Sequence, residues 1–280
     1  MKISIRLCAV LSIASALLSY TGSASAGPGG STVTEKHLGF DACQNISTTT
    51  MQNGWNGTSY GVAGFYIGGR TVDYVCPAHS SYHDATWVNA VYAQGWNFQL
   101  IWSGYQSPCV TARYLHSTDP ATAYSQGLSE ASAAAAAAGA RGFAQGSAIV
   151  LDLEGSITTS CPYLAATLQY VQGWVVGLYF YGSSGYWPGV YSGTCTFPNL
   201  ASVTWVPDHI SIAQWNNLPG VYQVSSCLSA GSWSFNQRSH QYRAAHSETW
   251  GGVAVSIDSS CYDERVAGAH VHSVNTSCLN

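Results

Sequence analysis

Two acidic residues close a hydrophobic run near the middle of the chain, in residues 148–155 (AIVLDLEG). Asp152 and Glu154 are two positions apart, and side chains alternate along a strand, so both are predicted to face one side, about 7 Å apart. Burying a carboxylate without a partner costs free energy, which argues against a purely structural pair. A carboxyl pair is suited to general acid catalysis, because burial and a neighbouring charge raise the pKa of the proton donor. The alternative is that these acids cap the turn after the strand.

Two further acids occupy comparable positions. Asp41 lies near the end of the first hydrophobic run, and Asp258 directly follows the last. The first and last strands of a closed barrel are neighbours, and the carboxyl ends of barrel strands form the rim of the active site. We therefore expect Asp41, Asp152, Glu154 and Asp258 to converge as catalytic residues over one opening. Hydrogen bonding to backbone amides at loop starts is the alternative for Asp41 and Asp258 individually.

Uncharged polar and aromatic residues recur near the predicted strand ends. Aromatic faces pack against the apolar faces of sugar rings, whereas Gln and Tyr side chains hydrogen-bond hydroxyl and amide groups. This combination favours a glycan-binding groove, with packing in the core or at the rim as the alternative for each residue. The predicted substrate-binding residues are Tyr66, Trp102, Tyr105, Gln106, Tyr191, Gln214, Trp215 and Gln241.

The elements that must position these residues alternate along the chain. Strands are predicted at residues 38–43, 62–68, 98–105, 148–154, 189–192, 210–215, 241–242 and 253–257. Helices are predicted at residues 84–94, 121–140 and 163–181, the second of which contains an alanine-rich run that favours helix. Strands alternating with helices over about 250 residues predict a (β/α)8 barrel of the TIM type. Its second half is expected to be irregular, because residues 217–237 resemble a loop.

The start of the chain has the features of a secretory signal. Lys2 and Arg6 precede an apolar stretch at residues 7–18, and residues 24–26 (ASA) form a small-residue cleavage site. We expect a signal peptide at 1–26, a flexible leader at 27–36 and a single domain at 37–280. No later segment offers about 20 consecutive apolar residues, so a secreted protein without membrane insertion is predicted.

Eight cysteines remain after residue 26, and an even number in an oxidising compartment predicts four disulfides. Eight cysteines allow 105 pairings, which the sequence does not distinguish. No Cys-x-x-Cys pair is present, and His270 and His272 lack recognisable further ligands, so neither a metal site nor a cofactor is predicted. The cysteines are Cys43, Cys76, Cys109, Cys161, Cys195, Cys227, Cys261 and Cys278.

Composition narrows the choice of partner. Hydrophobic residues make up 46% of the 280 residues and charged residues 8%, which excludes a disordered chain. The net charge of -4 comes without a basic run, so nucleic-acid binding is not expected. Low charge suits a polar, uncharged partner such as a polysaccharide, and we expect the protein to be a monomer.

An ordered series of short segments resembles a known family. The segments are residues 39–41 (GFD), 64–69 (GFYIGG), 104–106 (GYQ), 152–154 (DLE), 189–191 (GVY), 213–215 (AQW) and Asp258. They resemble the secreted glycoside hydrolase-like domain family of unknown function, which is related to the glycoside hydrolase family 25 lysozymes. The resemblance implies an irregular barrel with Glu154 as general acid, Asp152 as its partner and Asp41 and Asp258 at the first and last strands. Family 25 members tend to carry an acid in the second strand, where this chain has residues 66–69 (YIGG).

Three functions follow from these observations. The leading hypothesis is a secreted glycosidase that acts on a cell-wall or other extracellular polysaccharide, with peptidoglycan as a candidate. The second is a glycan-binding protein that has kept the barrel and lost turnover, as residues 66–69 (YIGG) in the second strand suggest. The third is a disulfide-stabilised protein that recognises other proteins.

Overall fold

The computed structural model describes residues 27–77, 83–180 and 185–280. The predicted signal peptide, residues 1–26, lies outside these ranges. The strands are β1 (Thr32–Glu35), β2 (Leu38–Ala42), β3 (Tyr60–Gly68), β4 (Asn97–Trp102), β5 (Ala148–Asp152), β6 (Trp187–Gly193), β7 (His209–Ala213), β8 (Gln237–Trp250) and β9 (Val253–Ala267). The helices are α1 (Thr48–Gly57), α2 (Val72–Val75), α3 (Ala85–Tyr92), α4 (Pro120–Gly139), α5 (Leu164–Phe180) and α6 (Phe197–Leu200), with short 3-10 helices η1 (Thr194–Thr196) and η2 (Thr276–Leu279).

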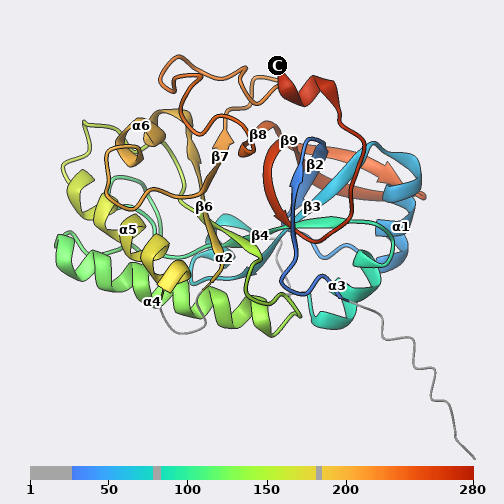
Figure 1. Ribbon diagram of the computed structural model, residues 1–280, viewed down its shortest axis with the longest axis horizontal. Helices are drawn as coiled ribbons and strands as arrows, with labels where there is room; N and C mark the ends of the chain where they lie inside the picture. The colour runs from blue at the N-terminus through green and yellow to red at the C-terminus, as the bar shows by residue number, and fades with distance from the viewer. Residues whose placement is uncertain (1–26, 78–82, 181–184) are drawn as a thin grey trace, which may run out of the picture.

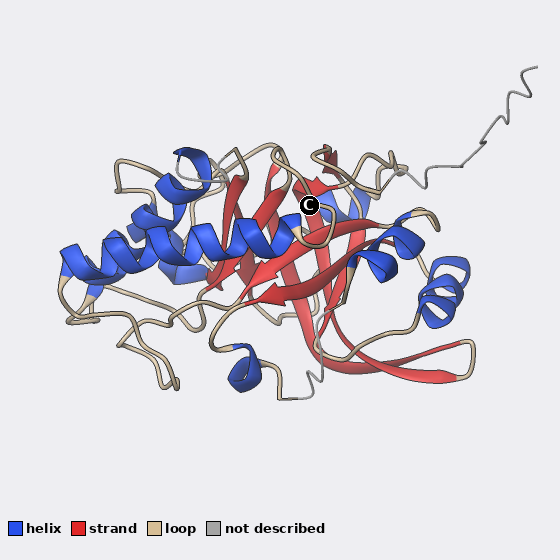
Figure 2. Ribbon diagram, turned by 90° about the horizontal axis from the view of Figure 1, so that it is seen from below, coloured by secondary structure: helices blue, strands red, loops and turns tan. Residues whose placement is uncertain are grey.

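Eight strands form a closed barrel. The strands β2 to β8 are parallel to one another in chain order, and β9 closes the barrel by pairing antiparallel with both β2 and β8. Helices α4 and α5 lie side by side against one side of the barrel (Figures 1 and 2). All eight predicted strands are present, so the predicted barrel is confirmed as a mixed α/β fold.

The barrel departs from a regular (β/α)8 pattern in its second half, where irregularity was expected. Within the described residues no helix joins β7 to β8, and β8 and β9 form a hairpin instead of being linked by a helix. Gly251 and Gly252 make its two-residue turn at φ values of 57° and 84°, which glycine adopts readily. The hairpin extends beyond the barrel as a long two-stranded arm (Figure 2).

Successive side chains of the barrel strands point alternately into the barrel and outward toward the helices. In β5, Ile149 and Leu151 belong to the main hydrophobic core, whereas Val150 and Asp152 face the interior. In β4, Phe98 and Leu100 join the same core, whereas Gln99 faces inward. Apolar residues on consecutive positions therefore reflect burial on both faces, as expected for parallel strands covered by helices.

Part of the expected leader, residues 27–36, forms a strand. Thr32–Glu35 form β1, which pairs antiparallel with residues 264–267 at the end of β9. The pairing is possible because β9 has 15 residues and extends past its partner β2, which leaves backbone groups free to accept another strand.

The four predicted disulfides are confirmed, and the structure supplies the pairing that the sequence left open. The bonded pairs are Cys43–Cys76, Cys109–Cys161, Cys195–Cys227 and Cys261–Cys278. Each joins segments at most 52 residues apart, so the disulfides fix individual loops and the C-terminal segment to the barrel. No helix of the described residues is long and apolar enough to cross a membrane.

Candidate active site

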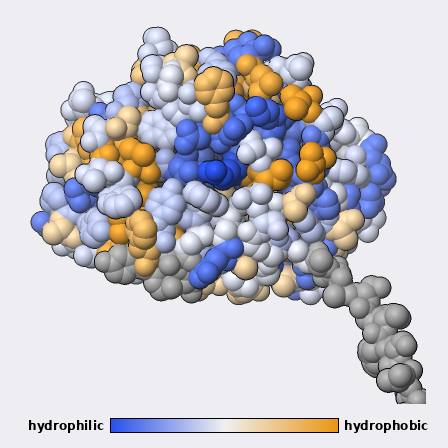
Figure 3. All heavy atoms as spheres, viewed as in Figure 1, coloured by the Kyte–Doolittle hydropathy of each residue, from blue (hydrophilic) through white to orange (hydrophobic). Residues whose placement is uncertain are grey.

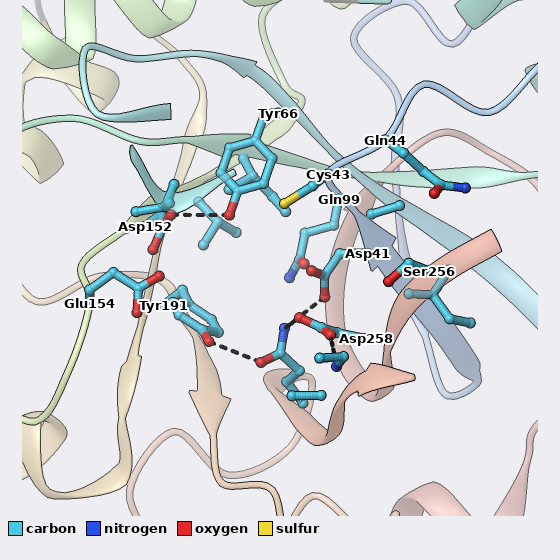
Figure 4. A pocket seen from close by; sticks show the side chains of 18 of the residues that line it. Asp41, Cys43, Gln44, Tyr66, Gln99, Asp152, Glu154, Tyr191, Ser256 and Asp258 are labelled. Carbon is cyan, nitrogen blue, oxygen red and sulfur yellow. Dashed lines mark hydrogen bonds between the residues drawn. The ribbon is translucent and has the colours of Figure 1, made fainter. Parts of the chain in front are cut away.

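A cavity of about 360 Å³ lies within the barrel, at the end where the parallel strands finish. All four predicted catalytic acids line it. Asp152 and Glu154 lie together on one side, and Asp41 and Asp258 lie on the other, with Tyr191 between the two pairs (Figure 4). On the surface, hydrophilic residues gather at the centre of one face of the molecule (Figure 3). The cavity thus brings together acids from the strands β2, β5 and β9 and the turn after β5.

The end of β5 is held by a side chain. Gln106 donates from Nε2 to the carbonyl oxygen of Asp152 at 2.8 Å, and the backbone N–H of Glu154 donates to Gln106 Oε1 at 2.8 Å. Gly155 follows with φ of 76°, a conformation that favours glycine and turns the chain away from the barrel. Gln106 therefore fixes the backbone that carries both acids, although it does not line the cavity.

Asp152 is 1% exposed and has little to stabilise a negative charge. The Tyr66 hydroxyl donates to Asp152 Oδ2 at 3.2 Å, and Oδ1 has no hydrogen-bond partner among the described residues. Burial, and then the charge of Glu154, raise the pKa of Asp152 well above its usual value, against the smaller opposing effects of Tyr66 and Ser103. Burial also raises the pKa of Glu154, against its hydrogen bond with Asp152. The pair is therefore suited to holding a proton at a pH where isolated carboxyl groups are ionised.

Asp41 and Asp258 are opposite each other in the antiparallel pairing of β2 with β9. Burial and then the charge of Asp258 raise the pKa of Asp41 well above its usual value, whereas the hydrogen bond from Gln241 lowers it. Burial likewise raises the pKa of Asp258, which accepts a hydrogen bond from the backbone N–H of Ala245. Asp258 was predicted to follow the last strand, but it lies within β9. It still reaches the cavity because β9 runs antiparallel and enters the barrel from this end.

Gln241 connects the acids to the aromatic wall. Its amide group donates to Asp41 Oδ2 at 2.9 Å and to Asp258 Oδ2 at 3.3 Å. Its Oε1 accepts hydrogen bonds from the Tyr191 hydroxyl at 2.9 Å and from Trp215 Nε1 at 2.8 Å. Both amide hydrogens and both lone pairs are therefore used, which fixes the orientation of the side chain. Trp215 is 61% exposed, so its ring is held at the cavity while much of it remains accessible.

Four of the predicted substrate-binding residues line the cavity: Tyr66, Tyr191, Gln241 and Trp215. The other four are Trp102, Tyr105, Gln106 and Gln214, which do not line it. Trp102 donates to Glu130 in α4 at 2.7 Å, on the helix side of β4, because the inward positions of this strand are Gln99 and Ile101. Tyr105 packs beneath the Arg70 guanidinium, 4.0 Å from the ring centroid.

Gln214 is turned toward neighbouring backbone and hydroxyl groups. Its Oε1 accepts from the Thr194 hydroxyl at 2.8 Å and from the backbone N–H of Ser225 at 2.7 Å. Sequence reasoning also missed three polar residues of the cavity, Gln44, Gln99 and Ser256. For Gln99 a signal was present, since a single polar side chain inside an otherwise apolar run marks a position that faces a polar interior.

The histidines near the C-terminus have partners in the protein. His272 lies between Glu35, with Nδ1 2.8 Å from Oε1, and the carbonyl oxygen of Gly95, 3.0 Å from Nε2. His270 contacts the carbonyl oxygen of Tyr92 at 2.8 Å. Within the described residues, no group of three His, Cys, Asp or Glu side chains is arranged to hold a metal ion.

Comparisons with known proteins place this geometry in a family. Residues 53–262 match the Rv2525c-like, glycoside hydrolase-like domain. The Mycobacterium tuberculosis Tat-secreted protein Rv2525c, solved in complex with L-tartrate, is 13% identical with a TM-score of 0.56, over 81% of this chain and 96% of that one. An uncharacterised B. stearothermophilus protein is 16% identical with a TM-score of 0.55, over 81% and 96% of the two chains.

A family 25 glycosyl hydrolase from Bacillus anthracis is 13% identical with a TM-score of 0.46, over 82% of this chain and 89% of that one. At these identities each likeness concerns the fold alone. No match was found among curated proteins. Because the family match covers most of the chain, the predicted resemblance to the glycoside hydrolase-like domain family is confirmed: this protein belongs to the Rv2525c-like, glycoside hydrolase-like domain family.

Proposed function

We propose that this protein is a secreted glycosidase that hydrolyses an extracellular or cell-wall polysaccharide, with peptidoglycan as the first substrate to test. The observation that carries the proposal is the pair Asp152 and Glu154. Both acids line a cavity in a glycoside hydrolase-like barrel, and burial raises the pKa of each.

In the proposed reaction, Glu154 donates a proton to the glycosidic oxygen as the bond to the anomeric carbon breaks; a water oxygen finally bonds to that carbon, and the proton released by the water restores Glu154. Asp152 orients the substrate or stabilises the positive charge that develops at that carbon. Tyr66 holds Asp152 through its hydroxyl. The exposed ring of Trp215, fixed through its N–H by Gln241, supplies an apolar face for stacking against a sugar.

Replacing the proposed proton donor tests the reaction. We expect wild-type protein to release oligosaccharides with new reducing ends from its substrate, and Glu154→Gln to release fewer by at least 100-fold, because general acid catalysis contributes about 10²–10⁴-fold. The screen covers peptidoglycan, chitin and plant and fungal polysaccharides, with products identified by mass spectrometry. Asp119→Asn is the control, because Asp119 lies outside the cavity and asparagine is an equally good N-cap for α4. Full activity of a folded Glu154→Gln protein would contradict the assignment.

A non-catalytic glycan-binding protein is the second candidate. Tyr66 favours it, because the second strand of this chain presents a hydroxyl donor to Asp152 where family 25 enzymes tend to have an acid. This function predicts saturable polysaccharide binding, weakened by Trp215→Ala, without new reducing ends. Product release that depends on Glu154 would exclude it.

Secretion is part of the proposal. Four disulfides and the signal-like residues 1–26 support an oxidising extracellular location, and we expect the mature protein to be a monomer. Expression of the full chain in a secreting host, followed by mass measurement of the protein in the medium, tests cleavage near Gly27. Light scattering of the same material gives its oligomeric state.

A further inference from the structure

We propose that the cavity selects sugars that carry a free amino group, and that the Asp41 and Asp258 pair provides the negative charge that binds the sugar ammonium group. This inference rests on the proposed glycan function and adds to it the chemical class of the substrate, a polysaccharide containing unacetylated hexosamine. It assigns the acid pair opposite Asp152 and Glu154 to substrate selection.

The first observation is the imbalance of charge in the cavity. Four of the thirteen acidic residues of the chain line it, and no Lys, Arg or His among the described residues does so. The one lysine and the six arginines after residue 26 have other positions, and His246, whose charge lowers the pKa of Asp258, lies outside the cavity lining. Arg70 pairs with Glu130, Arg265 with Asp208 and Lys36 with Asp263; Arg113 packs on Tyr114; Arg141 and Arg238 donate to backbone carbonyls; and Arg243 is exposed.

The second observation is an excess of hydrogen-bond acceptors over donors. Gln241 gives both its amide hydrogens to Asp41 and Asp258, and Ala245 gives its backbone N–H to Asp258. The buried Oδ1 of Asp152 has no hydrogen-bond donor among the described residues, and the hydrogen bond to Asp41 comes from Gln241. An ammonium group brings three donors and a positive charge, and therefore matches what the cavity lacks.

Other ligand classes fit less well. A uronic or sialic acid would bring its carboxylate among four carboxyl groups with no basic side chain to receive it. An N-acetylated sugar brings one neutral amide N–H, which offers a single donor and no charge. A bare metal ion is not favoured, since the described residues include no group of three ligands arranged to hold one. Burial raises the pKa values of Asp41 and Asp258, and the hydrogen bond from Ala245 and the charge of His246 offset only part of the rise at Asp258.

Binding measurements with three oligosaccharides of equal length test the inference. The probes are a glucosamine oligomer, an N-acetylglucosamine oligomer and a galacturonic acid oligomer, titrated calorimetrically at a pH where the amines are protonated. We expect the glucosamine oligomer to bind at least about tenfold more tightly than the N-acetylated one, which corresponds to about 1.4 kcal/mol. Added salt should reduce this preference, and binding should release protons from the carboxyl groups, seen as a dependence on buffer ionisation heat.

Neutral variants assign the preference to the acid pair. Asp41→Asn and Asp258→Asn each keep an oxygen that can accept from Gln241, and each should reduce the preference for the glucosamine oligomer by at least about threefold, which corresponds to about 0.65 kcal/mol. Asp119→Asn is the charge-matched control, because Asp119 lies outside the cavity and asparagine is an equally good N-cap for α4. Its preference should match that of wild type.

The outcomes separate this inference from the proposed hydrolysis. Equal affinity for the glucosamine and N-acetylglucosamine oligomers, tighter binding of the galacturonic acid oligomer, binding of none of the three, or an unchanged preference in both Asp→Asn variants would overturn it. Equal release of products from N-acetylated and unacetylated chains would support the proposed hydrolysis and contradict the proposed selectivity for free amines. Amine-selective binding without new reducing ends would support the selectivity and contradict the hydrolysis.

Discussion

Gln241 is the residue whose replacement should reveal the charges of the cavity most directly. We consider Gln241→Met, which keeps the length of the side chain and removes the two donors to Asp41 and Asp258. A hydrogen bond to a charged group contributes about 1.5–3 kcal/mol, against about 0.5–1.5 kcal/mol for a neutral one. Losing both donors should therefore lower the free energy of unfolding by about 3–6 kcal/mol when the acids are ionised and by about 1–3 kcal/mol when they are protonated.

The pH at which the difference appears follows from the pKa of Asp41. Burial holds the folded pKa well above the ordinary value of 3.8, so the stability linked to its proton is fully present below pH 3.8 and is lost as the pH rises through the folded pKa. The hydrogen bond from Gln241 lowers the pKa of Asp41, so removing this bond raises that pKa further and increases the loss of stability at high pH. We expect Gln241→Met to be about 2 kcal/mol more destabilising at pH 8 than at pH 4, or about 4–8 °C in Tm.

Denaturant unfolding at both pH values measures this difference, with Gln214→Met as the matched control. Gln214 lies outside the cavity and accepts hydrogen bonds from a neutral hydroxyl and a backbone N–H, so its replacement should cost the same free energy at either pH. The reasoning is refuted if Gln241→Met is equally destabilising at pH 4 and pH 8, or if Gln214→Met shows the same pH dependence.

Two further predictions concern the rim and the C-terminal segment. Replacing Cys43–Cys76 or Cys195–Cys227 by alanine pairs should cost about 4 kcal/mol in either case, because the closed loops have similar lengths of 33 and 32 residues. Glycan affinity should fall only in the variant without Cys43–Cys76, since Cys43 lines the cavity. Equal losses of affinity in the two variants would contradict this prediction. Burial lowers the pKa of His272, but the hydrogen bond and charge of Glu35 and the Gly95 carbonyl outweigh it, so the folded pKa is raised. The stability that protonated His272 contributes should be fully present below pH 6.5 and be lost as the pH rises through the folded pKa. This pH dependence should be absent in His272→Gln, and denaturant unfolding between pH 5 and 9 measures it.

The barrel strands could be predicted because burial on both faces leaves continuous apolar runs, as in β4 and β5. The hairpin was harder to recognise. Residues 243–249 of β8 lie outside the barrel, where alternate side chains are exposed, and their polar composition resembles a loop. The turn at Gly251 and Gly252 was an available signal for antiparallel pairing, and it would have placed Asp258 within a strand.

The four acids could be located from sequence because each interrupts an apolar run at a strand end or within a closing strand. The aromatic residues around them were less predictable, since a tryptophan suits both a core and a sugar-binding wall. Trp102 faces the helix side of β4, and a shift of one residue in the assumed strand phase would reverse that side, whereas Trp215 lies beyond the end of β7 and lines the cavity. The role of Gln241 depends on partners from β2, β6 and β9 and the segment after β7, which no local pattern reveals.

The antiparallel closure of the barrel has a consequence for the order of folding. The β8–β9 hairpin is local in sequence and has a tight turn, so it can form early, whereas pairing β9 with β2 requires the ends of the domain to meet. We expect this last step to create the acid pair of Asp41 and Asp258, together with its repulsion, so that a chain with an unclosed barrel carries no complete site. Pulsed hydrogen exchange during refolding should protect the amides of the hairpin before those between β2 and β9, and the opposite order would exclude this sequence of events.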